Sequence, residues 1–204
     1  MSKAINVRVA IVYHSGYGHT ARHAQAVALG AATAGAEALL ISVEEADAHW
    51  ETLEQVDAII FGCPTYMGSA SAQFKMFMDA SSRRAFLAAK WKDKLAAGFT
   101  NAANRSGDKL ATLQQLAIFA AQHGMNWINL GLHGGHNSSQ SSEDTLNRHG
   151  FYIGAAAQSD VDVGADEGAT QADLNTSAHL GSRVALAARQ MAAGRAALAE
   201  QAAA

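Results

Sequence analysis

The sequence predicts a doubly wound α/β domain, in which a five-stranded parallel sheet carries helices on both faces. Apolar runs of strand length alternate along the chain with segments whose apolar residues recur at helical spacing. This alternation is typical of parallel strands joined by right-handed helical crossovers. The chain has 204 residues, of which 49% are hydrophobic, so it can build a sizeable core. We expect one domain over residues 1–204.

The expected strands are the apolar runs, and helical periodicity follows most of them. In chain order the strands are Val7–Tyr13, Ala38–Val43, Ala58–Gly62, Lys94–Phe99 and Trp127–Leu132. The last one alternates apolar residues with asparagines, which suits a half-exposed edge strand. The expected apolar helix faces are Ala24, Val27, Ala28 and Ala31; Ala70, Phe74, Phe77 and Met78; Leu110, Leu113, Leu116 and Ala120; and Leu180, Val184, Ala187, Ala188 and Met191.

Three further features concern the connections and the ends of elements. A short acidic crossover containing Glu44 and Glu54 is expected to be helical, and Ser106 is expected to cap the helix after the fourth strand. The segment from about 133 to 170 is rich in Gly, Ser, Asn and Asp, and is too long for an ordinary connection. We expect it to be an inserted loop that serves as a functional lid or an oligomer contact. The alanine-rich tail beyond Ala193 is expected to fray.

Composition and charge exclude several classes of protein. The net charge of −3 gives no electrostatic footprint for nucleic acid, and the apolar runs are too short for membrane insertion. The single cysteine, Cys63, excludes an internal disulfide, and the N-terminal residues lack the features of a signal peptide. These observations predict a cytoplasmic protein.

The loop after the first strand has the composition of a phosphate-binding loop. It reads Ser15-Gly16-Tyr17-Gly18-His19-Thr20 and lies between a strand and a helix. Glycines allow its N–H groups to point into one concavity, and the helix N-terminus adds partial positive charge. The loop has no Lys or Arg, so an anion bound there would be held by neutral dipoles. Without further context it could equally be a turn whose glycines serve shape alone.

Two more loops are expected to reach the same place. Pro64 to Gly68 follow the third strand and offer Thr65, Tyr66 and Met67 to a flat ring. The segment from Thr100 to Gly107 follows the fourth strand and is small and polar. In a doubly wound sheet, ligands bind beyond the carboxyl ends of the strands at the switch in strand order. The three loops therefore predict one site.

The chain resembles the WrbA-like flavodoxin family. The resemblance rests on Ser15-Gly-Tyr-Gly-His-Thr20, on Gly62-Cys-Pro-Thr-Tyr-Met-Gly68 with the stretch from Phe74 to Asp79, and on Gln122-His-Gly-Met125, and it covers most of the chain. It implies a flavodoxin-like fold with strand order 2-1-3-4-5 and FMN as cofactor. Those family members carry a glycine-rich third loop, whereas this chain has Asn101-Ala-Ala-Asn-Arg-Ser-Gly107. We expect that loop to line the flavin ring and to decide what the cofactor does.

The resemblance also implies roles for individual residues. The stretch matching Ser15 to Thr20 binds the FMN phosphate, the stretch matching Thr65 to Gly68 wraps the ribityl chain and the ring, and the position of His123 reaches the flavin of a neighbouring subunit. The expected cofactor-binding residues are thus Ser15, Gly16, Tyr17, Gly18, His19, Thr20, Pro64, Thr65, Tyr66, Met67, Gly68, Thr100, Asn101, Ala102, Asn104, Gly107 and His123. From its sequence context alone, His123 would instead cap the negative end of the preceding helix.

The implied activity is transfer of two electrons from NADH or NADPH to quinones or similar flat acceptors by a homotetramer. A one-electron carrier of flavodoxin type is an alternative, although such carriers are usually strongly acidic to dock basic partners. A non-catalytic FMN-binding interaction protein and a nucleotide or phosphosugar binder are further alternatives. We expect no metal site, because His133, His136 and His149 lack a clear carboxylate or thiolate partner. Cys63 is expected to be a buried, inert side chain.

Overall fold

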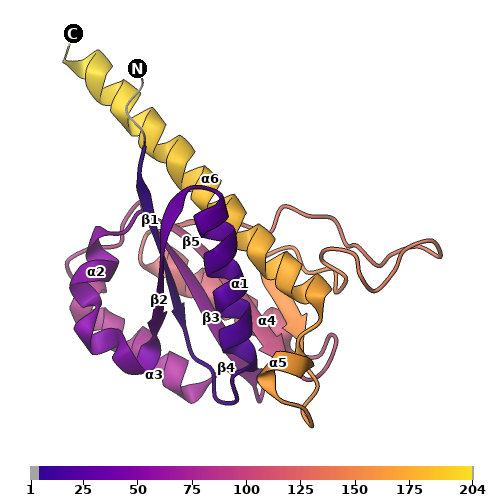
Figure 1. Ribbon diagram of the computed structural model, residues 1–204. Coiled ribbons are helices and arrows are strands. Elements are labelled where there is room, and N and C mark those ends of the chain that lie inside the picture. The colour runs from indigo at the N-terminus through magenta and orange to yellow at the C-terminus, as the bar shows by residue number, and fades with distance from the viewer. Residues whose placement is uncertain (1–4, 204) are drawn as a thin grey trace.

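The computed structural model describes residues 5–203, which form a parallel sheet between two layers of helices (Figure 1). The strand order is β2-β1-β3-β5-β6, so the doubly wound, flavodoxin-like order expected from the sequence is confirmed. The central strands are β1 (Val7–Tyr13), β2 (Ala36–Ser42), β3 (Ala58–Tyr66) and β5 (Leu95–Ala102). The last two extend further than expected, which carries part of the predicted site loops into the sheet.

The edge of the sheet beside β5 differs from the prediction. Instead of one strand over Trp127–Leu132, the short strands β6 (Asn126–Trp127) and β7 (Ala155–Gln158) pair with opposite ends of β5. The intervening residues, 128–154, leave the sheet, and we call them the insertion. Leu130 is fully buried in the core without lying in a strand. Its apolar side chain produced a strand-like pattern, because periodicity reports burial and not pairing.

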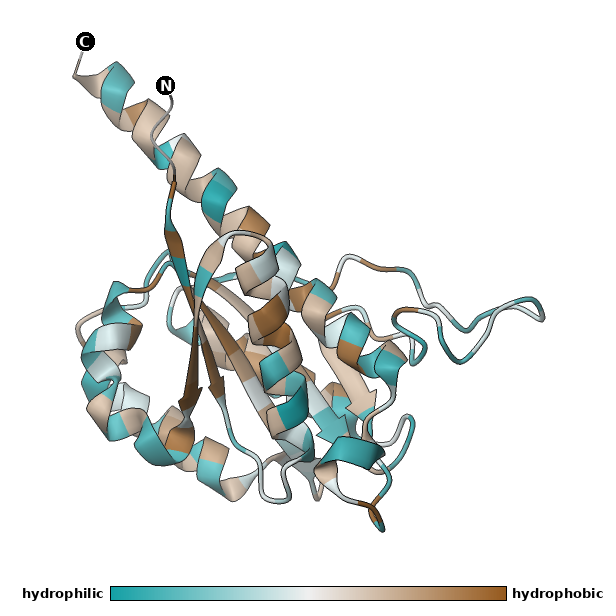
Figure 2. Cartoon of the chain, viewed as in Figure 1, coloured by the Kyte–Doolittle hydropathy of each residue, from teal (hydrophilic) through white to brown (hydrophobic). Residues whose placement is uncertain are grey.

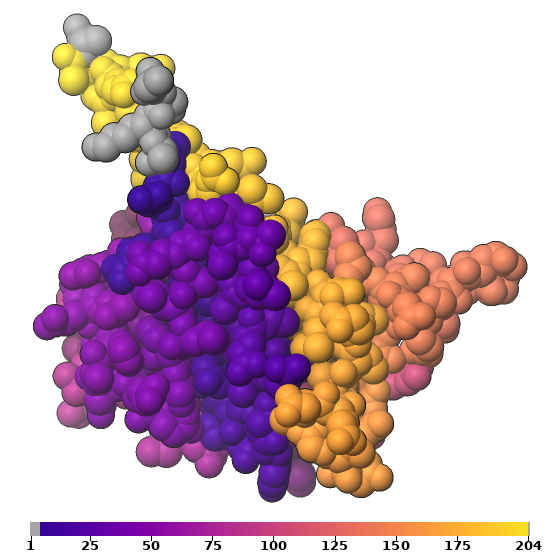
Figure 3. Space-filling model, in the orientation of Figure 1, coloured from indigo at the N-terminus to yellow at the C-terminus, as the bar shows by residue number. Residues whose placement is uncertain are grey.

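The prediction that residues from about 133 to 170 form one continuous inserted loop is therefore wrong. It contains β7, which lies in the sheet, and the short helix α5 (Ala165–Gly168). β7 has the sequence Ala-Ala-Ala-Gln, which lacks the β-branched and aromatic residues that mark strands. Only the part before β7 projects from the body, as the salmon-coloured segment in Figure 3 shows.

Helices cover both faces of the sheet. They are α1 (His19–Thr33), α2 (Trp50–Gln55), α3 (Ala72–Ser81), α4 (Lys109–Gln122) and α6 (Gln171–Ala202), with a 3₁₀ turn at Val43–Ala48 and a π turn at Ser82–Phe86. One core lies under α3 and α4 and the other under α1 and α6. Figure 2 shows the apolar strands enclosed between helices whose outer faces are hydrophilic.

Four local predictions about the helices are wrong. Ala70 lies in the two-residue strand β4 (Ser69–Ala70), which pairs with the end of β3, and not on α3. The residue preceding α4 is Asp108 and not the predicted cap Ser106. On α4 itself, Leu110 is exposed and Lys109 is buried, so Leu110 does not belong to the apolar face. The tail beyond Ala193 is helical to Ala202, consistent with the high helix propensity of alanine.

Gly30 on α1 and Gly181 on α6 allow these two helices to pack backbone against backbone. A Cβ on Gly181 would lie 1.9 Å from the carbonyl oxygen of Val27, whereas one on Gly194, further along α6, would meet nothing within 4 Å. We expect Gly181→Ala to lower the free energy of unfolding by about 1–3 kcal/mol through overpacking. Gly194→Ala should raise it by up to about 1 kcal/mol through helix propensity. Urea unfolding of both variants tests this, and equal stabilisation by both would contradict the close crossing.

Candidate functional site

A cavity of about 350 Å³ lies beyond the carboxyl ends of β1, β3 and β5. It is lined by residues from all three predicted loops and by two residues that follow β7. The lining residues are Ser15, Gly16, Tyr17, His19, Thr20, Pro64, Thr65, Tyr66, Met67, Asn101, Ala102, Ala103, Asn104, Asp108, Ser159 and Val161. The three loops thus converge on one site.

The first loop forms a neutral cradle at the N-terminus of α1. Gly18 adopts φ 88°, a conformation that favours glycine, and α1 begins at the next residue. The Ser15 hydroxyl oxygen accepts a hydrogen bond of 3.1 Å from the N–H of Ala21, which leaves the hydroxyl proton to donate elsewhere. Within residues 5–203, no Lys or Arg lines the cavity, and the first turn of α1 has no acidic residue. The cradle therefore offers N–H groups and hydroxyls to an anion.

His14 supports the first loop from behind. Its imidazole is buried, and its Nδ1 lies 2.6 Å from Oε1 of Glu44, in the 3₁₀ turn that follows the neighbouring strand β2. A Cβ on Gly16 would lie 3.8 Å from Nε2 of His14 and 3.0 Å from the Tyr66 hydroxyl. Gly16 therefore separates the imidazole from the second loop, and the absence of its side chain lets the two loops approach.

The second loop is a tight turn that places apolar side chains at the cavity mouth. Met67 has φ 49° and Gly68 has φ 88°, and β3 and β4 pair on either side of them. Positive φ at both central residues is the geometry of a type I′ hairpin. Met67 is fully exposed and Tyr66 is 39% exposed, although both line the cavity. These side chains are available to the face of a flat ligand.

The third loop is fixed in place from below. Lys109 is fully buried, and its Nζ donates to the carbonyl oxygens of Asn104, at 2.7 Å, and Ala157, at 2.8 Å. Asn101 accepts a hydrogen bond of 3.1 Å from the Ser159 hydroxyl through its Oδ1. Burial lowers the pKa of Lys109 to about 8. The loop that lines the cavity is thus tied to β7.

Thr65 and Thr100 join the second and third loops beneath the cavity. Their hydroxyl oxygens lie 2.7 Å apart, and that of Thr100 donates to the carbonyl oxygen of Cys63. Thr100 supports the site without lining it. Gly18, Gly68 and Gly107 likewise shape their turns at positive φ and do not line the cavity.

Within one chain, His123 does not line the cavity. It ends α4, its Nε2 is 2.9 Å from the Ser81 hydroxyl, and its ring lies 4.5 Å from that of Trp91. Burial lowers its pKa to about 4. His123 stands at the C-cap of α4, but its imidazole bonds to Ser81 and not to the carbonyl oxygens of that helix, so the side-chain cap expected from sequence context is not seen among the described residues. Its contact with a neighbouring subunit's flavin stays a prediction.

Four lining residues were not among those predicted: Ala103, Asp108, Ser159 and Val161. Ala103 belongs to the third loop and Asp108 directly follows that loop, before α4, and neither residue type indicated a role in the site. Ser159 and Val161 follow β7, the strand that the sequence pattern did not reveal. Recognising β7 as a parallel neighbour of β5 would have placed both at this edge of the sheet.

The cysteine and histidine candidates show no reactive arrangement. Cys63 is fully buried, and desolvation raises the pKa of its thiol to about 12. Among residues 5–203, no three His, Cys, Asp or Glu side chains are grouped so that they would hold a metal ion. No helix in the same range is long and apolar enough to cross a bilayer.

The site and the fold together define a class of protein. A neutral cradle at a helix N-terminus suits one terminal phosphate, and a tyrosine and a methionine beside it suit a flat ring. A site for such a ligand at the switch point of this strand order is typical of a flavodoxin-like flavoprotein. The residues present therefore fit flavin mononucleotide.

Comparison with known proteins gives the family. A sequence model of the NADPH-dependent FMN reductase family matches residues 43–140. Flavodoxin FldP of Pseudomonas aeruginosa is 42% identical over 195 residues, which cover 94% of this chain and 99% of that protein. An NAD(P)H dehydrogenase (quinone) of Archaeoglobus fulgidus is 31% identical over 207 residues, covering 90% and 98% of the two chains.

A solved structure agrees with these relatives. The flavodoxin, WrbA-like protein from Agrobacterium tumefaciens is 42% identical, matches with a TM-score of 0.72, and covers 90% of this chain and 98% of its own. The chain belongs to the WrbA-like family of flavodoxin-fold flavoproteins.

Proposed function

We propose that the protein is an FMN-dependent oxidoreductase that transfers two electrons from NADH or NADPH to quinones or similar flat acceptors. The observation that carries the proposal is the convergence of the neutral cradle with the exposed side chains of Tyr66 and Met67 in one cavity. The relatives named NAD(P)H dehydrogenase (quinone) support the reaction type.

In this proposal each loop has a separate task. The N–H groups and hydroxyls from Ser15 to Thr20 hold the phosphate, and Tyr66 and Met67 cover the ring. Bound FMN supplies the capacity to accept a hydride and pass on its electrons. Backbone N–H groups of the second and third loops stabilise negative charge on the ring, since preorganised donors in a desolvated site do so strongly. No side chain is required as a nucleophile.

A one-electron carrier is the second candidate, because a relative at 42% identity is named flavodoxin. The two candidates differ in whether the protein itself accepts electrons from a nicotinamide. The net charge of −3 favours the enzyme, since a carrier docks basic partners through a strongly acidic surface. We also propose a cytoplasmic homotetramer, with His123 of one subunit near the flavin of another.

The deciding experiment is a steady-state assay of FMN-loaded protein with NADPH or NADH and benzoquinone. The proposal expects oxidation of the nicotinamide well above the rate with free FMN, with one quinone reduced per nicotinamide. A rate no higher than that of free FMN would overturn the enzyme, and reduction only by an added reductase would favour the carrier.

A further inference from the structure

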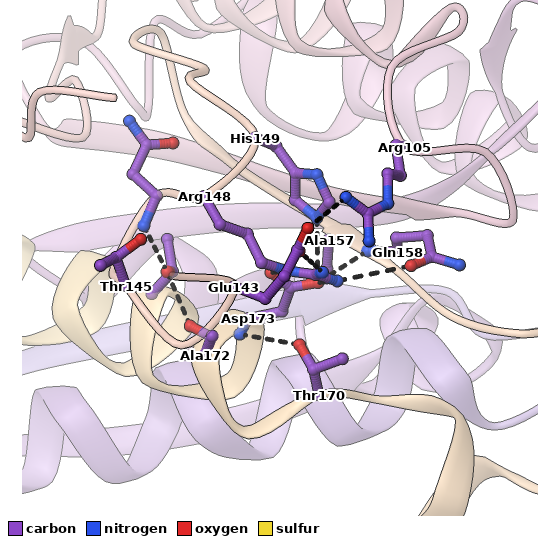
Figure 4. Close-up of polar contacts among 12 residues, drawn as sticks. Arg105, Glu143, Thr145, Arg148, His149, Ala157, Gln158, Thr170, Ala172 and Asp173 are labelled. Carbon is purple, nitrogen blue, oxygen red and sulfur yellow. Dashed lines mark hydrogen bonds and ion pairs between the residues drawn. The ribbon is translucent and has the colours of Figure 1, made fainter. Parts of the chain in front are cut away.

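Two arginines converge on one carboxylate beside the third loop (Figure 4). Nη1 of Arg105 lies 2.6 Å from Oε1 of Glu143, and Nη1 of Arg148 lies 2.7 Å from Oε2 of the same residue. Each carboxylate oxygen thus has its own guanidinium. The two hydrogen bonds hold the pKa of Glu143 at about 2, so the carboxylate is charged near neutral pH. This is the donor arrangement that proteins use for phosphate.

The inner arginine is built to present a donor in this direction. The side chain of Arg148 is 4% exposed, and Asp173 accepts from its Nε and Nη2, both at 2.9 Å. That bidentate contact fixes the guanidinium plane and leaves Nη1 aimed at Glu143. Arg105 is the opposite case, with a side chain 62% exposed on the third loop. One donor is preorganised and the other can adapt to a ligand.

The arginine pair adjoins the flavin cavity on two sides. Arg105 follows Asn104, which lines the cavity. Gln158 lies 3.4 Å from Nη2 of Arg148 and precedes Ser159, which also lines it. A ligand that extends from the cavity over the third loop would reach the exposed guanidinium of Arg105, and would reach Nη1 of Arg148 once Glu143 is displaced.

The carboxylate that occupies this position belongs to the projecting insertion (Figure 3). Among the described residues, the side-chain hydrogen bonds of Ser141 and Ser142 connect only residues 138–144. Glu143, by contrast, bonds to Arg105 on the third loop. Movement of residues 138–144 alone would withdraw the carboxylate, while Arg148, which also belongs to the insertion, would stay bound to Asp173.

We propose that Arg105 and Arg148 form a phosphate site at the rim of the flavin cavity, and that Glu143 occupies it as an internal substitute for the ligand. The chemical class of the ligand is a phosphate monoester, and the 2′-phosphate of NADPH is the source that the position favours. This choice of source rests on the proposed function, in which a nicotinamide dinucleotide reaches the cavity. The site would distinguish NADPH from NADH.

The test uses FMN-loaded protein and two nucleotide fragments, adenosine 2′,5′-bisphosphate and 5′-AMP, in a calorimetric titration. Removing the competing carboxylate with Glu143→Gln should tighten binding of the bisphosphate about tenfold, the effect of one charge-assisted contact. Binding of 5′-AMP should tighten less, because it lacks the 2′-phosphate that the proposal assigns to the arginine pair. Asp144→Asn is the matched control, since it removes the same charge from the next residue and should leave both affinities as in the wild type.

Adding Arg105→Gln to Glu143→Gln should abolish the gain. Equal bisphosphate affinity in the wild type and in Glu143→Gln, or a gain that persists without Arg105, would overturn the site. Glu143→Ala repeats the test without the amide. Inorganic phosphate binding as tightly as the bisphosphate would keep the phosphate site and overturn its assignment to a dinucleotide. Because binding is read without turnover, failure of the quinone assay alone would leave the site standing.

Discussion

Asp173→Asn is expected to lower the free energy of unfolding by about 3–5 kcal/mol, the usual cost of removing one partner from a buried ion pair. Every group that bonds to the carboxylate of Asp173 is a hydrogen-bond donor. These donors are Nε and Nη2 of Arg148, Nε2 of His149 and the backbone N–H of Gln158. An asparagine of the same shape would turn its own N–H₂ group toward one of these donors. Urea unfolding at neutral pH measures the loss.

The same residue gives a pH dependence with a defined sign. Hydrogen bonds from His149 and Arg148 hold the pKa of Asp173 well below its ordinary value, against the opposing effect of desolvation. A carboxyl pKa that is depressed in the folded state contributes stability above its unfolded pKa, near 3.8, and that stability is lost as the pH falls below it. The wild type should therefore lose stability between about pH 5 and pH 2, and Asp173→Asn should lose less over that range.

Asp166→Asn is the control for both measurements. Asp166 is 88% exposed and pairs with Arg22 at the surface, so its substitution should change stability by less than about 1 kcal/mol. A loss at Asp173 no larger than at Asp166 would show that the buried cluster contributes no more than a surface pair.

The double variant Ser15→Ala/Thr20→Ala is expected to weaken FMN binding by at least about 100-fold, since a hydrogen bond to a charged group contributes about 1.5–3 kcal/mol. Both residues line the cavity, and the Ser15 hydroxyl has its proton free to donate. Among the described residues, no Lys or Arg lines the cavity to compensate. Quenching of flavin fluorescence on titration of the apoprotein gives the affinity, and circular dichroism checks the fold.

Thr33→Ala provides the matched control for this titration. Thr33 is the same residue type in the same helix, but it is exposed at the far end of α1 from the cradle. It should bind FMN as the wild type does. Equal affinity in the double variant and in Thr33→Ala would place the phosphate outside the cradle.

The strands could be predicted because they are buried apolar runs, whereas their order came from the resemblance to a known family. The convergence of the three loops then follows from the rule that ligands bind at the switch in strand order. The predicted strand Val7–Tyr13 needed no correction, because an apolar run of that length, buried on both faces, is typical of a central strand in a parallel sheet. β7 could not be predicted, because Ala155–Gln158 is stabilised as a strand by its pairing with β5 and not by its own residues.

Lys109 was missed for a related physical reason. A lysine at the start of a predicted helix is normally solvated, and only the three-dimensional structure shows two carbonyl oxygens facing its ammonium group. The predicted apolar face of α4 was wrong for the same reason, since the sequence indicated that Leu110, and not Lys109, would be buried. The polar support beneath the third loop was thus invisible to hydrophobic periodicity.

The way Lys109 holds the third loop has a consequence for mutational tolerance. Its ammonium group contacts backbone oxygens of Asn104 and Ala157, so the anchor does not depend on which side chains the loop carries. Ala102, Ala103 and Asn104 can then be exchanged while the path of the backbone is kept. The side chains of this loop that line the cavity can therefore be randomised, or can vary in evolution, without a change to the scaffold that holds the loop.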